Sequence, residues 1–185
     1  MREMKQSRKT RYTQMALRES LLELIQQKPI TKITIKEICE RADINRTTFY
    51  NHYTDQFDLL HKIEDEALKS LEEAYSGLVG NHDTKSMLVI LEGIFQYYID
   101  NRRNFEILLN DNSHINFRNQ MVQMFFRLFK DQQLAGANLK DVPRNEYFVF
   151  ILNGAASLIQ YWLTREPCLT AKEMVAIMTR LSSWG

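Results

Sequence analysis

Apolar side chains recur at intervals of three and four residues along almost the whole chain, a spacing that places them on one side of an α-helix. Only six glycines and three prolines interrupt the 185 residues, so long helices are favoured over short strands and tight turns. The pattern predicts an all-α fold of about nine helices, with no strand and no internal repeat. The expected helices span residues 10–28, 35–42, 44–53, 56–78, 84–101, 105–110, 114–134, 144–164 and 171–182.

Residue types that cap helices stand at several of these predicted starts. Thr34 is followed three residues later by Glu37, which is the spacing of a capping box. Their side chains are expected to bond each other's backbone N–H groups and so to open the second helix. The other expected caps are Asn45, Asp55 and the pair Thr170 and Glu173.

Composition and hydropathy place the chain among folded cytoplasmic proteins. With 44% hydrophobic and 25% charged residues, it can bury a core and is not of the disordered class. The N-terminal stretch MREMKQSRKTRYTQ carries charges where a signal peptide needs an apolar segment. The most apolar run, residues 147–163, is shorter than the ~20 residues of a membrane span. Cys39 and Cys168 are far apart in the sequence and suggest no disulfide framework.

None of the motifs that mark common enzyme sites occurs in the sequence. It has no GxGxxG, GxxxxGK[ST], HExxH or GxSxG segment. His61 and Glu64 lie one helical turn apart, but without further ligands a solvated charged face is a better interpretation than a metal site. The chain is therefore predicted not to be an enzyme, and to hold no metal and no cofactor.

Charge is distributed unevenly along the chain, although the net formal charge is only +1. Residues 1–53 hold 11 Lys and Arg against 6 Asp and Glu, which leaves 13 against 17 in the remainder. A basic N-terminal third fits a module that meets a polyanion such as a nucleic acid. The alternative is a chance asymmetry between solvated surfaces.

The stretch INRTTFYNHY, residues 44–53, is rich in hydrogen-bonding side chains. At about 100° per residue, Phe49 and Tyr53 share one side of a helix, and Thr47 and Asn51 lie on the other. A short helix that follows a tight turn, with a further helix before the pair, is typical of a helix-turn-helix, whose second helix enters a DNA major groove. The alternative is an exposed polar face with no binding role.

Residues 33–63, ITIKEICERADINRTTFYNHYTDQFDLLHKI, resemble the DNA-binding region of the TetR family of transcriptional regulators. The family pattern is T-x-x-x-I-x-x-x-A-x-V-S-x-x-x-F/Y-Y-x-H/Y-F-x-x-K-x-x-L. Identical or similar residues stand here at Thr34, Ile38, Ala42, Ile44, Asn45, Phe49, Tyr50, His52, Tyr53, Leu59 and Leu60. The resemblance implies a helix-turn-helix domain over residues 1–54, and a helical ligand-binding and dimerisation domain over residues 55–185. It also implies a homodimer on a palindromic DNA operator.

The same resemblance implies which residues contact DNA. The residues expected at base edges, where Arg can pair with guanine and Asn with adenine, are Arg46, Thr47 and Asn51. Those expected at phosphates are Thr48, Tyr50 and His52. Further DNA-binding candidates are Thr34, Lys36, Asn45 and an arm containing Arg8, Lys9 and Arg11.

Two positions depart from the family pattern. Asp43 stands at the turn where many members have glycine, and Asp is among the few residues that tolerate a left-handed conformation. Gln56 stands where many members have Lys at the start of the fourth helix. The turn is therefore expected to form, and one phosphate contact is expected to be weaker.

The later segments ILEGIFQYYIDNRRNFEILLNDN and YFVFILNGAASLIQYWL are similar to a C-terminal domain of TetR-type regulators from Gram-positive bacteria, some related to an activator of dihydroxyacetone utilisation. Residues 147–163 are apolar nearly all round and contain small residues that let another helix approach closely. With the last helix they are predicted to form half of a four-helix dimer interface, the alternative being the core of a monomer. The interface candidates are Gly154, Ala155, Leu158, Trp162, Met174, Ile177, Met178 and Leu181.

An aromatic and methionine-rich set could line a cavity for a small-molecule effector, although plain core packing describes most of it. The pocket candidates are Phe95, Tyr98, Phe105, Leu108, Phe117, Met121, Met124, Phe125, Tyr147 and Ile151. Such a ligand would shift a two-state equilibrium through the fourth helix and change the separation of the two DNA-reading helices. The predicted function is a ligand-responsive repressor. The alternative is an activator, or a DNA-bound module that works through a partner protein.

Overall fold

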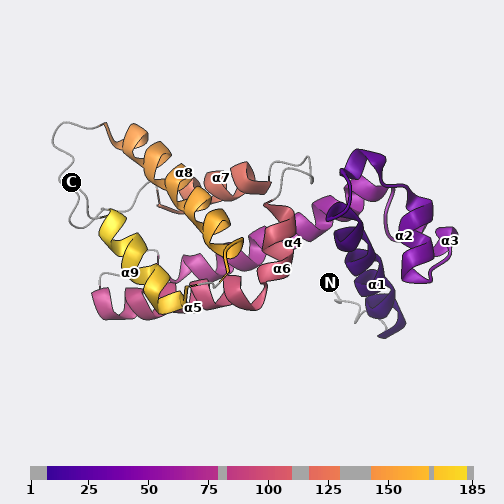
Figure 1. Ribbon diagram of the computed structural model, residues 1–185, viewed down its shortest axis with the longest axis horizontal. Helices are drawn as coiled ribbons and strands as arrows, with labels where there is room; N and C mark the ends of the chain where they lie inside the picture. Colours follow the sequence, from indigo (N-terminus) through magenta and orange to yellow (C-terminus); the bar gives the residue numbers. More distant parts are fainter. Residues whose placement is uncertain (1–7, 79–82, 110–116, 130–142, 167–168, 183–185) are drawn as a thin grey trace, which may run out of the picture. The chain divides into compact units, whose positions relative to one another are not determined.

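The computed structural model describes residues 8–78, 83–109, 117–129, 143–166 and 169–182, and every regular element among them is helical (Figure 1). The elements along these residues are α1 (Arg8–Ile25), a 3-10 helix η1 (Ile30–Lys32), α2 (Ile35–Ala42), α3 (Arg46–Tyr50), α4 (Gln56–Ser76), α5 (Thr84–Asp100), α6 (Arg102–Leu108), α7 (Phe117–Phe129), α8 (Arg144–Leu163) and α9 (Ala171–Ser182). The all-α fold predicted from the apolar spacing is confirmed. No helix within these ranges has the length and apolarity needed to cross a bilayer.

Helix boundaries differ from the prediction where a turn intervenes. The first helix ends at Ile25, and the short helix η1 follows Pro29, which periodicity did not indicate. The helix α3 ends at Tyr50 rather than Tyr53, because the backbone N–H groups of His52 and Tyr53 both donate to the Phe49 carbonyl in a turn. Residues 114–116 and 130–134 of the predicted seventh helix, and Cys168, lie outside the described residues.

The predicted caps form. The Thr34 hydroxyl accepts from the Glu37 N–H at 3.3 Å, while the Glu37 carboxylate accepts from the Thr34 N–H at 2.9 Å. These two bonds complete a capping box and satisfy backbone donors that the first turn of α2 leaves free. The other predicted caps are present at Asn45, Asp55 and the pair Thr170 and Glu173.

The described helices form two compact units, which divide within α4 between Glu66 and Ala67. In the first unit α1 packs against α2, and α2 packs against α3. Its fully buried side chains include Leu17, Leu21, Ile38, Phe49 and Leu59. One aromatic residue of α3 is thus part of the core that holds α3 in place.

The turn between α2 and α3 depends on Asp43. This residue has φ 54° and ψ 43°, a left-handed conformation that Asp adopts more easily than most side chains. Its N–H donates to the carbonyls of Cys39 and Glu40 and so ends α2. The departure from glycine at this position is accommodated as expected.

The second unit contains α5 to α9 and the end of α4. In it α5 packs against α9 and α6, and α8 packs against α6 and α7. Polar side chains tie the helix ends together: Arg102 Nε donates to the Leu163 carbonyl at 2.6 Å, and Gln160 Nε2 donates to the Leu109 carbonyl at 2.7 Å. These bonds satisfy carbonyls at the ends of α8 and α6.

Candidate nucleic-acid interface and associated surfaces

Aromatic rings hold α3 from behind. Phe49 and Tyr53 are buried, with ring centroids 5.6 Å apart. At the other end, the Asn45 side chain accepts from the Thr48 N–H at 2.7 Å and caps the helix. A five-residue helix has little stability of its own, so this packing and this cap fix its position.

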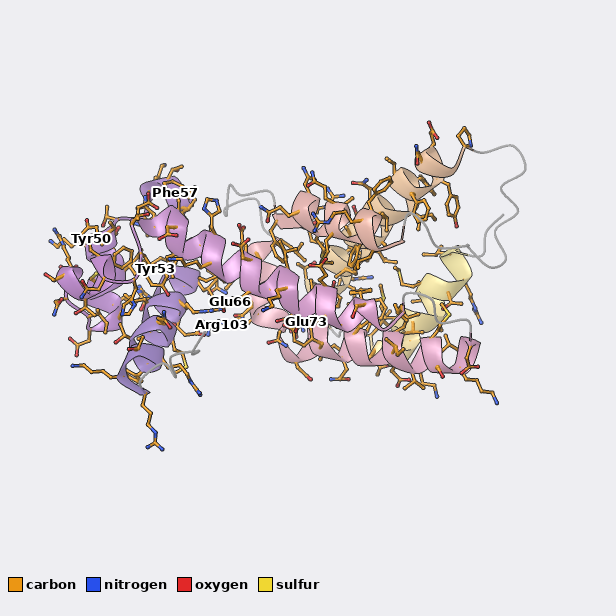
Figure 2. All side chains as sticks on the ribbon, turned by 180° about the vertical axis from the view of Figure 1, so that it is seen from behind. Tyr50, Tyr53, Phe57, Glu66, Glu73 and Arg103 are labelled. Carbon is orange, nitrogen blue, oxygen red and sulfur yellow. The ribbon has the colours of Figure 1, made fainter. Side chains whose placement is uncertain are left out.

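The opposite side of α3 faces solvent. Arg46, Thr47, Tyr50 and Asn51 are exposed, and Tyr50 retains 57% of its accessible surface. Tyr50 is labelled in Figure 2. Two further candidates, Thr48 and His52, are half-buried. This outer face therefore presents hydroxyl, amide and guanidinium groups of the kinds that bond base edges and phosphate oxygens.

The candidates on α2 are placed less favourably for DNA. Thr34 is exposed, but its hydroxyl belongs to the capping box and donates to Glu37 at 2.9 Å. Lys28, which donates to the Glu37 carboxylate at 2.5 Å, and the bonds from Thr34 lower the pKa of Glu37 to about 2. A fixed negative charge thus lies at the start of α2, and it works against the phosphate contact predicted for Thr34.

The exposed basic candidates are Lys36 on α2, which pairs with Glu40 at 3.6 Å, and Arg8, Lys9 and Arg11 in the first turn of α1. Lys36 and Arg46 also line a shallow hollow beside the α2–α3 turn. The periodicity argument missed Lys62 of α4, whose ammonium group bonds the chain just after α3. Its spacing of four residues from Asp58 is a sequence signal for their ion pair, but not for the bond to His52.

Glu64 corrects one sequence-based expectation. Instead of lying on a solvated face with His61, its side chain is only 1% exposed, whereas His61 is exposed. No described residue bonds either carboxylate oxygen, and burial, assisted by repulsion from Asp65, raises the pKa of Glu64 to about 8. Within the described part of the chain, no three His, Cys, Asp or Glu side chains gather as metal ligands.

The pocket candidates divide between two places. Eight of them are buried side chains of the second unit: Phe95, Tyr98, Phe105, Leu108, Phe117, Met121, Met124 and Phe125. The ring of Tyr98 packs at 4.7 Å from Phe105, and its hydroxyl donates to Met121 Sδ at 3.6 Å. Tyr75, which the periodicity argument did not single out, adds a buried ring 4.6 Å from Phe125, and burial raises its pKa.

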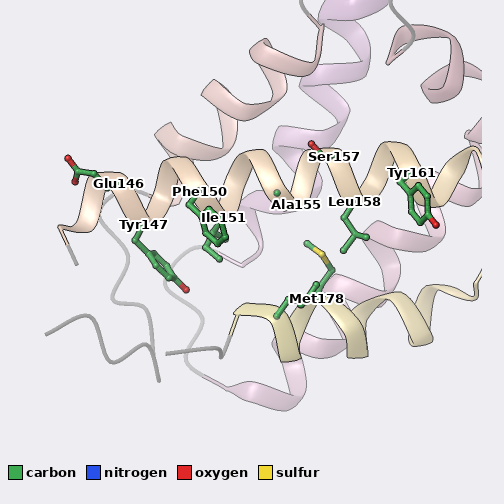
Figure 3. A pocket seen from close by; sticks show the side chains of 11 residues that line it. Glu146, Tyr147, Phe150, Ile151, Ala155, Ser157, Leu158, Tyr161 and Met178 are labelled. Carbon is green, nitrogen blue, oxygen red and sulfur yellow. The ribbon is translucent and has the colours of Figure 1, made fainter. Parts of the chain in front are cut away.

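The other two pocket candidates, Tyr147 and Ile151, lie elsewhere, in an apolar groove of ≈ 730 Å³ between α8 and α9 (Figure 3). The groove residues are Glu146, Tyr147, Phe150, Ile151, Gly154, Ala155, Ser157, Leu158, Tyr161, Met178 and Leu181. Phe150 is 75% exposed there, and Tyr161 is also exposed. Large exposed rings beside an apolar groove are typical of an interaction surface.

Six of the eight dimer candidates are at or near this groove. Gly154, Ala155, Leu158, Met178 and Leu181 line it, and Ile177 is exposed on α9. Trp162 and Met174 differ from the prediction, because both are buried inside the subunit. Trp162 packs 5.4 Å from Phe95, and its Nε1 donates to the Leu169 carbonyl, so it stabilises the subunit's own core.

Two family models match the chain. The model for bacterial regulatory proteins of the tetR family matches residues 17–63, which include α2 and α3. The model for a transcriptional regulator C-terminal region matches residues 85–183, more than half of the chain. The chain belongs to the TetR family. The members of this family are DNA-binding transcriptional regulators, a class of protein that is generally not enzymatic.

Individual relatives agree with this membership. The uncharacterised HTH-type transcriptional regulator YxbF of Bacillus subtilis (strain 168) is 27% identical over an alignment of 157 residues, which covers 81% of the chain. The chain spans 39% of the length of that relative. A TetR regulator from Streptococcus agalactiae 2603V superposes with a TM-score of 0.65 at 20% identity, over 95% of this chain and 96% of that one.

Two further solved structures share the fold. The fatty acid degradation regulator FadR from Bacillus halodurans has a TM-score of 0.70 at 13% identity, over 98% of both chains. The dihydroxyacetone kinase operon activator DhaS has a TM-score of 0.55 at 18% identity, over 92% of this chain and 93% of that one. At these identities the likeness concerns the fold alone.

Proposed function

We propose that this TetR-family protein is a homodimeric, effector-responsive repressor that reads a palindromic operator with α3. Residues 1–54 would form the DNA-binding domain, and residues 55–185 the ligand-binding and dimerisation domain. The observation that carries the proposal is the polar outer face of α3, where Arg46, Thr47, Tyr50 and Asn51 are exposed over a buried aromatic base. Its place of action is the cytoplasm, where a bacterial chromosome lies.

In this proposal each residue of the outer face has a role that follows from its chemistry. Arg46 is suited to a bidentate contact with guanine, and Asn51 to one with adenine. Tyr50, Thr48 and His52 are suited to phosphate oxygens, which position the helix but carry no sequence information. In a two-fold dimer, the centres of the two reading helices would stand ~34–36 Å apart, one turn of DNA.

The dimer would form through α8 and α9. A Cβ added at Gly154 would meet nothing within 4 Å, so the subunit's own packing does not require glycine in the middle of α8. Glycine in a helix interior costs about 1 kcal/mol relative to Ala, and close approach of a second copy's helix would offset that cost. The exposed ring of Phe150 and the apolar groove beside it would then be covered by the same surface of the partner.

An effector would bind among the buried aromatic and thioether side chains of the second unit. Tyr75 and Tyr98 are the hydroxyl-bearing groups placed there that could orient a mainly apolar ligand. Binding would displace α4, which continues from residue 56 to residue 76. A coupling of about 1–3 kcal/mol between effector and operator is the ordinary size of such a response.

The test is DNA binding by variants of the outer face. A duplex selected from a random-sequence pool by the unchanged protein serves as operator. We expect Tyr50→Ala and Asn51→Ala each to weaken binding by about 1–3 kcal/mol, roughly 5- to 150-fold, while circular dichroism and molecular mass stay the same. Gln26→Ala, a change at an exposed residue just after α1 in the first unit, is the matched control. If both face variants bind like the unchanged protein, α3 does not read DNA.

A further inference from the structure

The ammonium group of Lys62, on α4, lies at the junction between α4 and the end of the reading helix. It donates to the His52 carbonyl at 2.9 Å, two residues beyond the end of α3. It also pairs with Asp58 at 3.2 Å and stands 4.8 Å from the centroid of the Tyr53 ring, which Figure 2 labels. One side chain of α4 therefore binds the backbone, a ring and a carboxylate next to α3.

Asp58, in the first turn of α4, bonds the segment between α3 and α4, residues 51–55. Its carboxylate accepts from the Thr54 N–H at 2.9 Å, and this bond, together with Lys62, lowers the pKa of Asp58. Its own N–H donates to the Asp55 side chain at 2.8 Å, which caps α4. The connection between α3 and α4 is thus bonded at both ends to the first two turns of α4.

We propose that Lys62 is a positioning residue for DNA reading, which fixes the C-terminal end of α3 against α4. This inference rests on the proposed function. Tyr50 and Asn51 stand immediately before the carbonyl that Lys62 holds. Because α3 has only five residues, a small rotation at its end would move both side chains together. Any displacement of α4 would reach the reading helix through the same bond.

A direct phosphate contact by Lys62 is the competing explanation, since its side chain keeps 48% of its surface exposed. The two explanations differ in salt dependence. Loss of a phosphate contact makes the negative slope of log K against log salt shallower by about 0.9, and it weakens binding to any duplex. Loss of a positioning bond weakens binding to the operator alone and leaves the slope unchanged.

The experiment measures affinity for the selected operator and for a scrambled duplex over a range of salt concentrations. We expect Lys62→Met to weaken operator binding by about three- to tenfold, with an unchanged salt slope and an unchanged affinity for the scrambled duplex. Lys69→Met is the matched control, because it removes the same charge from the same helix. Lys69 is exposed, and its ammonium group lies 4.0 Å from the Glu73 carboxylate, in a long and exposed pair. Lys69→Met should leave operator affinity within about twofold.

A second pair of variants separates positioning from charge. Asp58→Ala removes a negative charge, which by electrostatics alone would tighten DNA binding, whereas loss of the link should weaken it. Glu73→Ala removes the same charge from an exposed position and should not weaken binding. Circular dichroism establishes that all four variants are folded.

The proposal is overturned if Lys62→Met binds the operator like the unchanged protein, if its loss is equal on both duplexes with a smaller salt slope, or if Asp58→Ala binds the operator more tightly. Failure of the proposed function gives a different result. In that case Tyr50→Ala and Asn51→Ala also leave operator binding unchanged.

Discussion

The outer faces of α3 and α8 are built in opposite ways. At α3 the ring of Phe49, and that of Tyr53 just after the helix, turn inward, and the outer face presents hydroxyl, amide and guanidinium groups, with Tyr50 as its exposed ring. On α8 the rings of Phe150 and Tyr161 turn outward, beside small residues and an apolar groove. A polar face is well solvated in the absence of DNA. Exposed rings, in contrast, gain free energy when another apolar surface buries them, which favours a stable interface. The comparison indicates one face for a transient, charged partner and one for a lasting, apolar partner.

Placing a charge on the apolar face should have the largest effect. We expect Phe150→Asp to weaken the dimer by about 3 kcal/mol or more, over a hundredfold in dissociation constant, because a carboxylate would be buried against the partner's groove. Light scattering across a concentration series measures the mass. Operator affinity should fall with it, since a monomer meets only one half-site.

The control for this change is Val89→Asp. Val89 is 70% exposed on α5 and does not line the groove, so its replacement should leave the mass unchanged. If both variants are monomers, or if Phe150→Asp remains a dimer, the face of α8 around Phe150 is not shown to be the dimer interface.

The first unit buries a carboxyl group, that of Glu64 on α4. Its folded-state pKa of about 8 lies above the ordinary value of 4.5, so between these pH values the folded chain binds more protons than the unfolded chain. This group's contribution to stability is therefore present below pH 4.5 and is lost as pH rises to about 8. We expect Glu64→Gln to be more stable than the unchanged protein by about 1–3 kcal/mol at pH 9 and nearly equal at pH 5.

Thermal unfolding of both proteins between pH 5 and pH 9 measures this difference. Glu73→Gln is a suitable control, because Glu73 is exposed on the same helix and does not contribute to the shift of the Glu64 pKa. A stability gain for Glu64→Gln that is the same at every pH would show that the carboxyl group does not titrate in this range.

Asn45 caps α3 and should therefore contribute to the free energy of unfolding in the absence of DNA. Asn45→Ala removes the acceptor for the Thr48 N–H and should lower the free energy of unfolding by about 1 kcal/mol. Asn51→Ala, at the exposed end of the same helix, should change stability by less than about 0.5 kcal/mol while weakening operator binding. Urea unfolding distinguishes the two, and equal stability losses would mean that the outer face also supports the fold.

The smallest effect should be a gain in stability at glycine positions. Gly154→Ala and Gly93→Ala should each stabilise the isolated subunit by about 0.5–1 kcal/mol, because the added Cβ meets open space in both helices. Only Gly154→Ala should also weaken the dimer. If both variants dimerise equally well, α8 does not cross its partner at Gly154.

The sequence predicted well what depends on residues close together in the chain. The capping boxes, the inward side of α3 and the left-handed Asp43 all follow from spacing and side-chain chemistry within a few residues. What it missed depends on packing between helices. Residues 147–163 are apolar nearly all round, so periodicity could not separate buried Trp162 from exposed Phe150. Likewise, nothing local to Lys62 specified that its ammonium group would bond the end of α3.

The most direct test of the account is methylation interference on the selected operator. Guanine N7 lies in the major groove, where α3 is proposed to bind. We predict interference by guanine N7 methylation in two patches about ten base pairs apart, and loss of that interference in Arg46→Ala. A single patch, or an unchanged pattern in Arg46→Ala, would contradict the claim that two copies of α3 read the duplex.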